Sequence, residues 1–160
     1  STQEWADYVV ALVRDVHRSL DYLASRPDID SRRVAYEGFS WGGLMAPMVL
    51  AVENRFAAAV VALGGLPADI RTRPEVDPLN YAPRVTLPVL MLNGRYDLTV
   101  ALEPSARPMF QLLGTPQSDK VLRVYESDHA IPKSELIRES LAWLDKYLGP
   151  VEVPGARKTP

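Results

Sequence analysis

The chain of 160 residues is 47% hydrophobic and 24% charged, which is typical of one globular domain with a sizeable core and excludes a disordered or fibrous chain. A formal net charge of -2 provides no basic field for a phosphate backbone, so we expect no nucleic-acid partner. The absence of cysteine excludes disulfides, thiolate metal sites and a cysteine nucleophile. No run of about 18 apolar residues occurs, and we expect no membrane partner.

The first predicted element is an amphipathic helix. Between Trp5 and Leu23, apolar residues recur at steps of three and four, the spacing of one helix face. Ser1 with Glu4 has the pattern of a capping box and predicts a helix start at the first residues. His17 lies on this helix, where a packed or solvent-facing histidine is the ordinary interpretation.

Strands and helices alternate after this helix. Apolar runs predict four strands, over residues 34–39, 56–65, 88–94 and 119–127. Helical patterns predict three further helices, over residues 42–53, 101–114 and 132–149. A proline-rich connection, residues 68–83, follows the second strand. Strands that are apolar on both faces and alternate with helices predict an α/β fold, with a parallel sheet of about four strands and helices on both faces.

The motif GFSWGG places Ser40 at the end of the first predicted strand. A nucleophile on a sharp strand-to-helix turn has strained dihedrals, and side chains two residues to either side would collide where strand and helix cross. Gly38 and Gly42 are expected to remove those collisions, and Gly43 to let the helix pack closer. We predict Ser40 as a nucleophile and the Trp41 N–H as a donor to the oxyanion that forms on acyl transfer.

Two candidate partners for Ser40 follow later strands. Asp97 in NGRYD comes after the third strand, and His129 in SDHA comes after the fourth. Ligands of parallel α/β sheets bind beyond the carboxyl ends of the strands, so these side chains should meet at one edge. An unperturbed histidine pKa of about 6.5 suits a base that works near neutrality. We predict His129 as the general base and Asp97 as the acid that orients it.

Other carboxylates close to these motifs have separate interpretations. Asp77 and Asp69, both in the proline-rich connection, remain alternatives for the acid, and Asp128 is interpreted as a surface residue. Glu37 lies inside the first predicted strand, which requires either a partner such as an arginine or exposure at a sheet edge. The histidines and carboxylates show no metal-ligand spacing, and no phosphate loop is present, so we expect no metal and no organic cofactor.

Together, GFSWGG, NGRYD and SDHA resemble the α/β-hydrolase superfamily, whose triad follows the chain order Ser, Asp, His. The stretch RPDIDSRRVAYEGFSWGG is most similar to its dienelactone-hydrolase and prolyl-oligopeptidase-like branches. The resemblance covers the chain from the first helix to about Leu148. It implies that Ser40 is the nucleophile, His129 the base and Asp97 the residue that stabilises the histidine.

By the same resemblance, the chain corresponds to the C-terminal half of the fold. In the full fold, four strands precede the nucleophile strand and supply a second oxyanion N–H, whereas one helix precedes it here. An uncovered edge strand normally drives association. We therefore expect a homo-oligomer that pairs through the strand carrying Val34 and Tyr36, pairing with a missing N-terminal half in another polypeptide, or a chain that is a fragment of a longer enzyme.

The predicted function is a serine hydrolase that acts on a small-molecule carboxylic ester through an acyl-enzyme. An ester is favoured over a peptide because the connection between Gly65 and Pro88 is short and offers no large cap. The alternatives are a non-catalytic hydrolase-like module of a larger protein used for association, a serine peptidase of prolyl oligopeptidase type, and perhydrolysis by the same triad.

The predicted domain covers residues 1–149. Residues 150–160, PVEVPGARKTP, contain too little apolar surface to pack and are expected to form a mobile tail. The first ten residues lack the charged-then-apolar plan of a signal peptide. The sequence leaves the compartment open, with a cytoplasmic location favoured.

Overall fold

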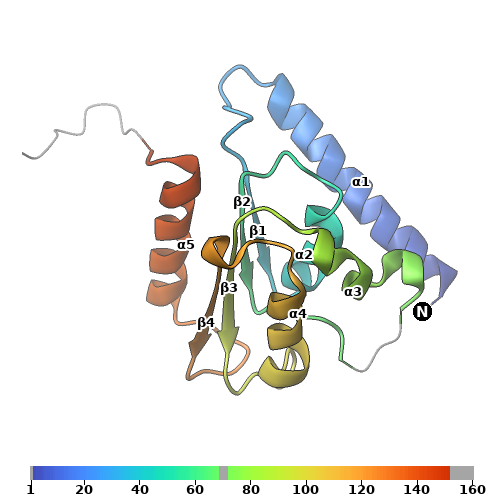
Figure 1. Ribbon diagram of the computed structural model, residues 1–160. Coiled ribbons are helices and arrows are strands. Elements are labelled where there is room, and N and C mark those ends of the chain that lie inside the picture. Colours follow the sequence, from blue (N-terminus) through green and yellow to red (C-terminus); the bar gives the residue numbers. More distant parts are fainter. Residues whose placement is uncertain (1, 69–71, 152–160) are drawn as a thin grey trace, which may run out of the picture.

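The alternating elements form one parallel sheet in the computed structural model, which describes residues 2–68 and 72–151 (Figure 1). The strands are β1 (Ala35–Phe39), β2 (Ala58–Ala62), β3 (Val89–Gly94) and β4 (Lys120–Tyr125). They lie in the order β1-β2-β3-β4, and every neighbouring pair is parallel. The predicted α/β fold with four parallel strands is therefore confirmed.

Helices cover both faces of this sheet (Figure 1). They are α1 (Gln3–Ser25), α2 (Trp41–Leu50), α3 (Pro78–Tyr81), α4 (Arg107–Leu112) and α5 (Lys133–Leu148). In Figure 1, α5 lies on one side of the sheet, and α1, α2 and α4 lie on the other. None of these helices is both long and apolar enough to cross a membrane, as far as residues 2–68 and 72–151 are concerned.

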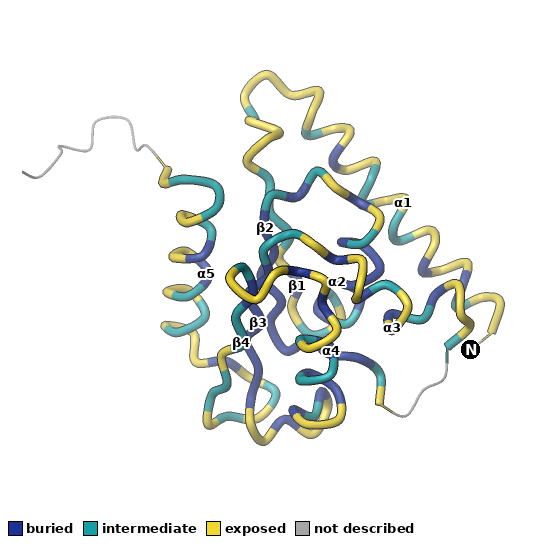
Figure 2. The backbone as a smooth tube through the Cα atoms, in the orientation of Figure 1, coloured by how far each residue is buried: buried dark blue, intermediate teal, exposed yellow. Residues whose placement is uncertain are grey.

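The core lies on both faces of the central strands, which are buried along their length (Figure 2). Side chains of a strand alternate between the two faces. Val61 and Met91 therefore join the cluster beneath α1, α2 and α4, while Val60 and Leu92 join the cluster beneath α5. Full burial of each such side chain contributes roughly 2 kcal/mol to the free energy of unfolding. The well-packed strands β2 and β3 therefore hold the loops that follow their carboxyl ends in place.

β1 lies at the edge of the sheet. Within the described residues it pairs with β2 alone, Glu37 is exposed, and half of the Phe39 surface is exposed. The carboxylate of Glu37 is therefore accommodated by an open sheet edge, which was one of its two predicted environments.

Several helix boundaries differ from the predictions, and α2 ends at Leu50 rather than at residue 53. The N-cap of α1 is Thr2, whose Oγ1 accepts a hydrogen bond from the Trp5 N–H at 3.3 Å, rather than Ser1, which lies outside the described residues. The helix predicted over residues 101–114 is divided into a π turn (Leu102–Ala106) and α4, which ends at Leu112. Pro108 lacks the N–H that would continue a regular ladder, which accounts for the division.

The described residues also contain short 3₁₀ turns. Three 3₁₀ turns lie at Pro74–Val76, Ala82–Arg84 and Gln117–Asp119. The first two flank α3, so the predicted proline-rich connection contains one short helix and two turns that have proline in their first positions. The predicted tail lies outside the described residues from residue 152 onward.

Candidate active site

Ser40 occupies a strained turn between β1 and α2. Its backbone has φ 51° and ψ -102°, a region that costs a non-glycine residue on the order of 1–3 kcal/mol. Two backbone hydrogen bonds hold it there: the Ser40 N–H donates to the Ala62 carbonyl at 2.8 Å, and the Leu44 N–H donates to the Ser40 carbonyl at 2.9 Å. The turn thus lies directly beyond the carboxyl end of β1, as the motif predicts.

The glycines of this turn have different roles. A Cβ on Gly38 would lie 2.7 Å from the Gly42 backbone, and one on Gly43 would lie 2.7 Å from the Cα of Gly64. Both positions are therefore closed to a side chain. The prediction for Gly42 is wrong, because a Cβ there would meet only the Tyr36 hydroxyl, at 3.7 Å. Gly42 contributes to the close packing through its main chain, which lies against Gly38.

Ser40, His129 and Asp97 form one continuous chain of hydrogen bonds. The Ser40 Oγ lies 2.8 Å from the Nε2 of His129, and the Nδ1 of His129 lies 2.7 Å from the Oδ2 of Asp97. The residues follow β1, β4 and β3, so the structure brings together all three side chains that the sequence singled out.

The hydrogen-bond acceptors of Asp97 and His129 indicate which ring nitrogen of His129 carries the proton. Asp97 is 2% exposed, and its Oδ1 already accepts hydrogen bonds from the N–H groups of Thr99 at 2.8 Å and Val100 at 2.9 Å. Its Oδ2 is an acceptor for the proton on His129 Nδ1. The Nε2 of a neutral imidazole is then left as an acceptor for the hydroxyl proton of Ser40.

The described alternative for the acid, Asp77, lies outside this series of hydrogen bonds. Asp77 caps α3, where its carboxylate accepts a hydrogen bond from the Leu79 N–H at 3.0 Å. Asp128 is exposed, and Asp69 lies outside the described residues. His17 on α1 has its Nε2 3.6 Å from a carboxylate oxygen of the buried Glu53. Its packed position on the helix agrees with the ordinary interpretation of that histidine.

Trp41 is the first residue of α2. The first N–H groups of a helix have no intrahelical acceptor and carry the positive end of the helix dipole. The Trp41 N–H therefore remains available next to Ser40 for a developing negative charge. Within the described residues, no group of three or more His, Cys, Asp or Glu side chains is arranged to hold a metal ion.

Aromatic side chains flank the serine. The Phe39 ring meets the His129 ring edge to face at 6.5 Å, and the Trp41 Nε1 donates a hydrogen bond to the Tyr8 hydroxyl at 3.3 Å. The sequence patterns did not single out Phe39 or Tyr8. The detectable signal was an aromatic residue on each side of Ser40, Phe39 and Trp41.

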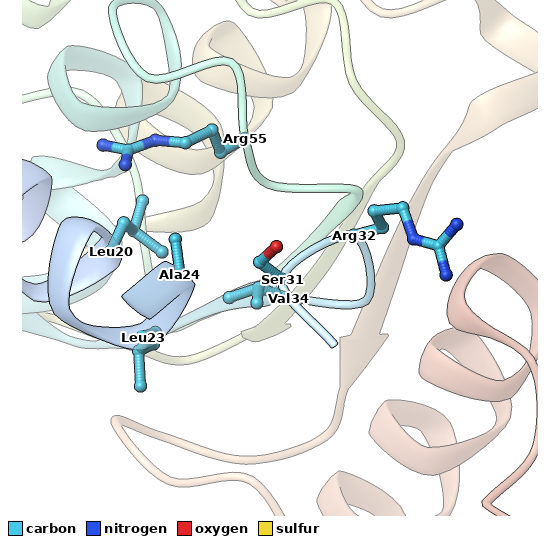
Figure 3. Close-up of a pocket in the computed structure, with 7 residues that line it drawn as sticks. All are labelled: Leu20, Leu23, Ala24, Ser31, Arg32, Val34 and Arg55. Atoms are coloured by element: carbon cyan, nitrogen blue, oxygen red, sulfur yellow. The ribbon is translucent and has the colours of Figure 1, made fainter. Parts of the chain in front are cut away.

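A separate cavity of about 350 Å³ lies at the other end of β1 (Figure 3). It is lined by residues of α1 and the following loop, with Val34 and Arg55: Leu20, Leu23, Ala24, Ser31, Arg32, Val34 and Arg55. Arg55 is paired with Glu53 and Asp21, and Arg32 with Asp30. In Figure 3, the guanidinium group of Arg32 points away from the other labelled residues. The candidate site therefore lies at the opposite, carboxyl end of the sheet.

Comparisons with known proteins match this arrangement. The model of the dienelactone hydrolase family matches residues 2–139. A Salmonella typhimurium protein that bears the provisional name carboxymethylenebutenolidase is 32% identical over 128 residues, which cover 76% of this chain and 47% of that protein. An uncharacterized peptidase of Bacillus subtilis is 24% identical over 84% of this chain and 25% of its own length.

Solved structures show the same fold. A cold-adapted esterase from an Arctic intertidal metagenomic library superposes with a TM-score of 0.73 at 29% identity, over 88% of this chain and 60% of the esterase. The chain spans about half the length of the Salmonella typhimurium protein and a quarter of the length of the Bacillus subtilis protein. A match over residues 2–139 is most of the chain, and the chain belongs to the dienelactone hydrolase family.

Proposed function

We propose that this chain carries the catalytic residues of a serine hydrolase that cleaves carboxylic esters through an acyl-enzyme. The observation that carries the proposal is the hydrogen-bonded series from Ser40 through His129 to Asp97, at distances of 2.8 and 2.7 Å. In this series, a nucleophile, a base and an orienting acid have the mutual geometry that acyl transfer requires.

In the first half of the proposed reaction, the Ser40 Oγ attacks the ester carbonyl carbon while His129 Nε2 takes the hydroxyl proton. The Asp97 carboxylate stabilises the imidazolium that results. The negative charge on the tetrahedral oxygen faces the Trp41 N–H. When the intermediate collapses, the bond to the leaving alcohol oxygen breaks and His129 returns the proton to that oxygen, which leaves the acyl group on Ser40.

In the second half, water replaces the alcohol. His129 Nε2 takes a proton from the water molecule as its oxygen attacks the acyl carbon. The bond between that carbon and the Ser40 Oγ then breaks, and the proton passes from His129 to Ser40. The carboxylic acid is released and the starting arrangement of the three residues is restored.

Two observations support an ester as the substrate. The esterase that is 29% identical shares the fold over most of this chain. The described connection between β2 and β3 contains only turns and the four-residue α3, which leaves no large element to select a peptide. The similarity to an uncharacterized peptidase favours amide hydrolysis as the second candidate. A pair of substrates with the same acyl group, one an aryl ester and one an anilide, distinguishes the two.

Covalent labelling tests the proposal. A fluorophosphonate reacts with an activated serine hydroxyl, so we expect one adduct per chain, on the peptide that contains Ser40. Ser40→Ala should abolish the adduct, and Ser19→Ala, at an exposed serine of α1, should leave it unchanged. A correctly folded wild-type chain that takes up no label would instead favour the non-catalytic module.

A further inference from the structure

The hydrogen bond between Asp97 and His129 joins two separate loops. Asp97 lies in the loop after β3, and His129 lies in the loop of residues 126–132 between β4 and α5, which has no regular secondary structure. Asp97 is fixed locally, because its carboxylate accepts hydrogen bonds from the backbone N–H groups of Thr99 and Val100. The placement of His129 therefore depends on what holds its loop against the loop of Asp97.

Part of this attachment is made by the main chain. The Arg95 N–H donates to the Tyr125 carbonyl at 2.8 Å, and the Tyr96 N–H donates to the Ser127 carbonyl at 2.9 Å. The loops also pack very closely at Gly94, where a Cβ would lie 2.0 Å from the Asp128 carbonyl oxygen. These contacts bring the two main chains together, and side-chain contacts between the loops add to them.

The side chain of Glu126 supplies such contacts. One carboxylate oxygen accepts a hydrogen bond from the Arg95 Nε, and the other accepts one from the Tyr96 hydroxyl at 2.6 Å. Both donors lie immediately before Asp97 in the sequence, and Glu126 precedes His129 by three residues. We call Arg95, Tyr96 and Glu126 the loop clamp. It spans the two loops that carry the base and the acid.

The charge states favour an intact loop clamp at neutral pH. Hydrogen bonds from Tyr96 and Arg95 lower the pKa of Glu126, and the same carboxylate raises the pKa of Tyr96. Glu126 is thus ionised while Tyr96 keeps its proton. The side chain of Glu126 is 64% exposed, and an exposed ion pair adds little to the stability of a fold. We therefore expect the ion pair of Glu126 to affect the relative placement of the two loops rather than the stability of the fold.

We propose that Glu126 is a positioning residue for His129, holding the base loop in register with the acid loop so that Nδ1 meets Asp97 and Nε2 meets Ser40. This proposal rests on the proposed function, because the geometry matters through the reaction of Ser40. Glu126 takes no direct part in proton transfer, and nothing in the family comparison or the sequence motifs pointed to it.

The variants are Glu126→Ala, which removes both acceptors, and Glu126→Gln, which keeps one carbonyl oxygen. A misplacement of 1 Å costs on the order of 100-fold in rate, so a partial loosening should lower the rate of Ser40 labelling about 10-fold in Glu126→Ala. Glu126→Gln should restore much of that loss. In ester hydrolysis, the change should fall on kcat and leave KM close to the wild-type value.

Asp28→Ala is the matched control. Asp28 is also an exposed loop carboxylate that accepts two hydrogen bonds from an arginine, Arg26, at 2.8 and 2.6 Å. It precedes β1 and so lies at the opposite end of the sheet from Ser40. We expect wild-type rates for this variant, which separates loss of an exposed ion pair from loss of the loop clamp.

Proton NMR reads the geometry independently of turnover. A proton held between His129 Nδ1 and Asp97 should give a resonance far downfield in the wild-type chain and in Asp28→Ala. Glu126→Ala should broaden or abolish it, with circular dichroism unchanged, and Glu126→Gln should recover part of it. A Glu126→Ala chain that keeps the resonance and the labelling rate overturns the proposal.

The two proposals fail in different ways. If the wild-type chain takes up no fluorophosphonate, the proposed function fails and the NMR comparison alone decides the role of Glu126. If the wild-type chain is labelled but Glu126→Ala reacts at the same rate, the hydrolase remains and the positioning role fails. Should Glu126→Ala not fold, Glu126→Gln carries the same comparison with a smaller expected change.

Discussion

Replacing Asp97 with asparagine should block proton transfer while preserving the fold. The carboxylate Oδ1 accepts hydrogen bonds from the N–H groups of Thr99 and Val100, so an asparagine must place its single oxygen there. Its NH₂ group then faces the Nδ1 of His129, which must become an acceptor. The ring proton moves to Nε2, and Ser40 loses its base.

The expected magnitude follows from that tautomer. The corresponding change in a serine protease lowers kcat on the order of 10⁴-fold, which corresponds to about 5 kcal/mol of transition-state stabilisation. Asparagine retains nearly the same volume and both backbone hydrogen bonds, so the free energy of unfolding should change by only about 1 kcal/mol. A large loss of rate with a small loss of stability is the signature of this mechanism.

The assay is the rate of Ser40 labelling by a fluorophosphonate, measured together with urea unfolding. Asp77→Asn is the control, because Asp77 also accepts a backbone N–H but lies at the start of α3. The control should react at the wild-type rate. An Asp97→Asn chain that reacts within tenfold of the wild type, or an equal loss in Asp77→Asn, would refute the assignment of the acid.

Three further outcomes are expected. Gly43→Ala should lower the free energy of unfolding by about 1–3 kcal/mol in urea titrations, as an overpacked site does, whereas Gly42→Ala should be tolerated because space is open there. Hydrogen bonds from Arg55 lower the pKa of Glu53, so they stabilise the fold above the unfolded-state pKa of about 4.3, and this stabilisation is lost as the pH falls. The free energy of unfolding of Glu53→Gln should therefore change less with pH in the acid range than that of the wild type. We also propose that the open edge of β1 drives self-association, and sedimentation that shows only monomers at all concentrations would contradict this.

The positions of the three central residues could be predicted because they follow from topology. The carboxyl ends of parallel strands lie at one end of the sheet, so residues just after β1, β3 and β4 are placed at the same end. Asp97 stood out from Asp77 because a fully buried strand precedes it. The roles of Gly38 and Gly43 could be predicted, because the motif indicates that β1 and α2 cross closely at Ser40. The motif does not show which main-chain segment passes closest, so the role of Gly42 could not be predicted.

Other features depend on contacts that no local pattern contains. Thr2 and Ser1 are both good capping residues, and the hydrogen bond to the Trp5 N–H selects Thr2. Glu126 is an exposed glutamate beside a strand, and its partners lie about thirty positions earlier in the chain. The aromatic pair Trp41 and Tyr8 likewise depends on how α1 packs beside α2. Such contacts are known only once the elements are placed.

The central claim is that Ser40 forms the acyl-enzyme, and rapid acid quenching tests it most directly. The chain would be mixed with an activated aryl ester, quenched during turnover and analysed by peptide mass spectrometry. We predict one acyl group per chain on the peptide containing Ser40, and none in Ser40→Ala. Release of product without an acyl group on Ser40, or an acyl group that persists in Ser40→Ala, would contradict the account.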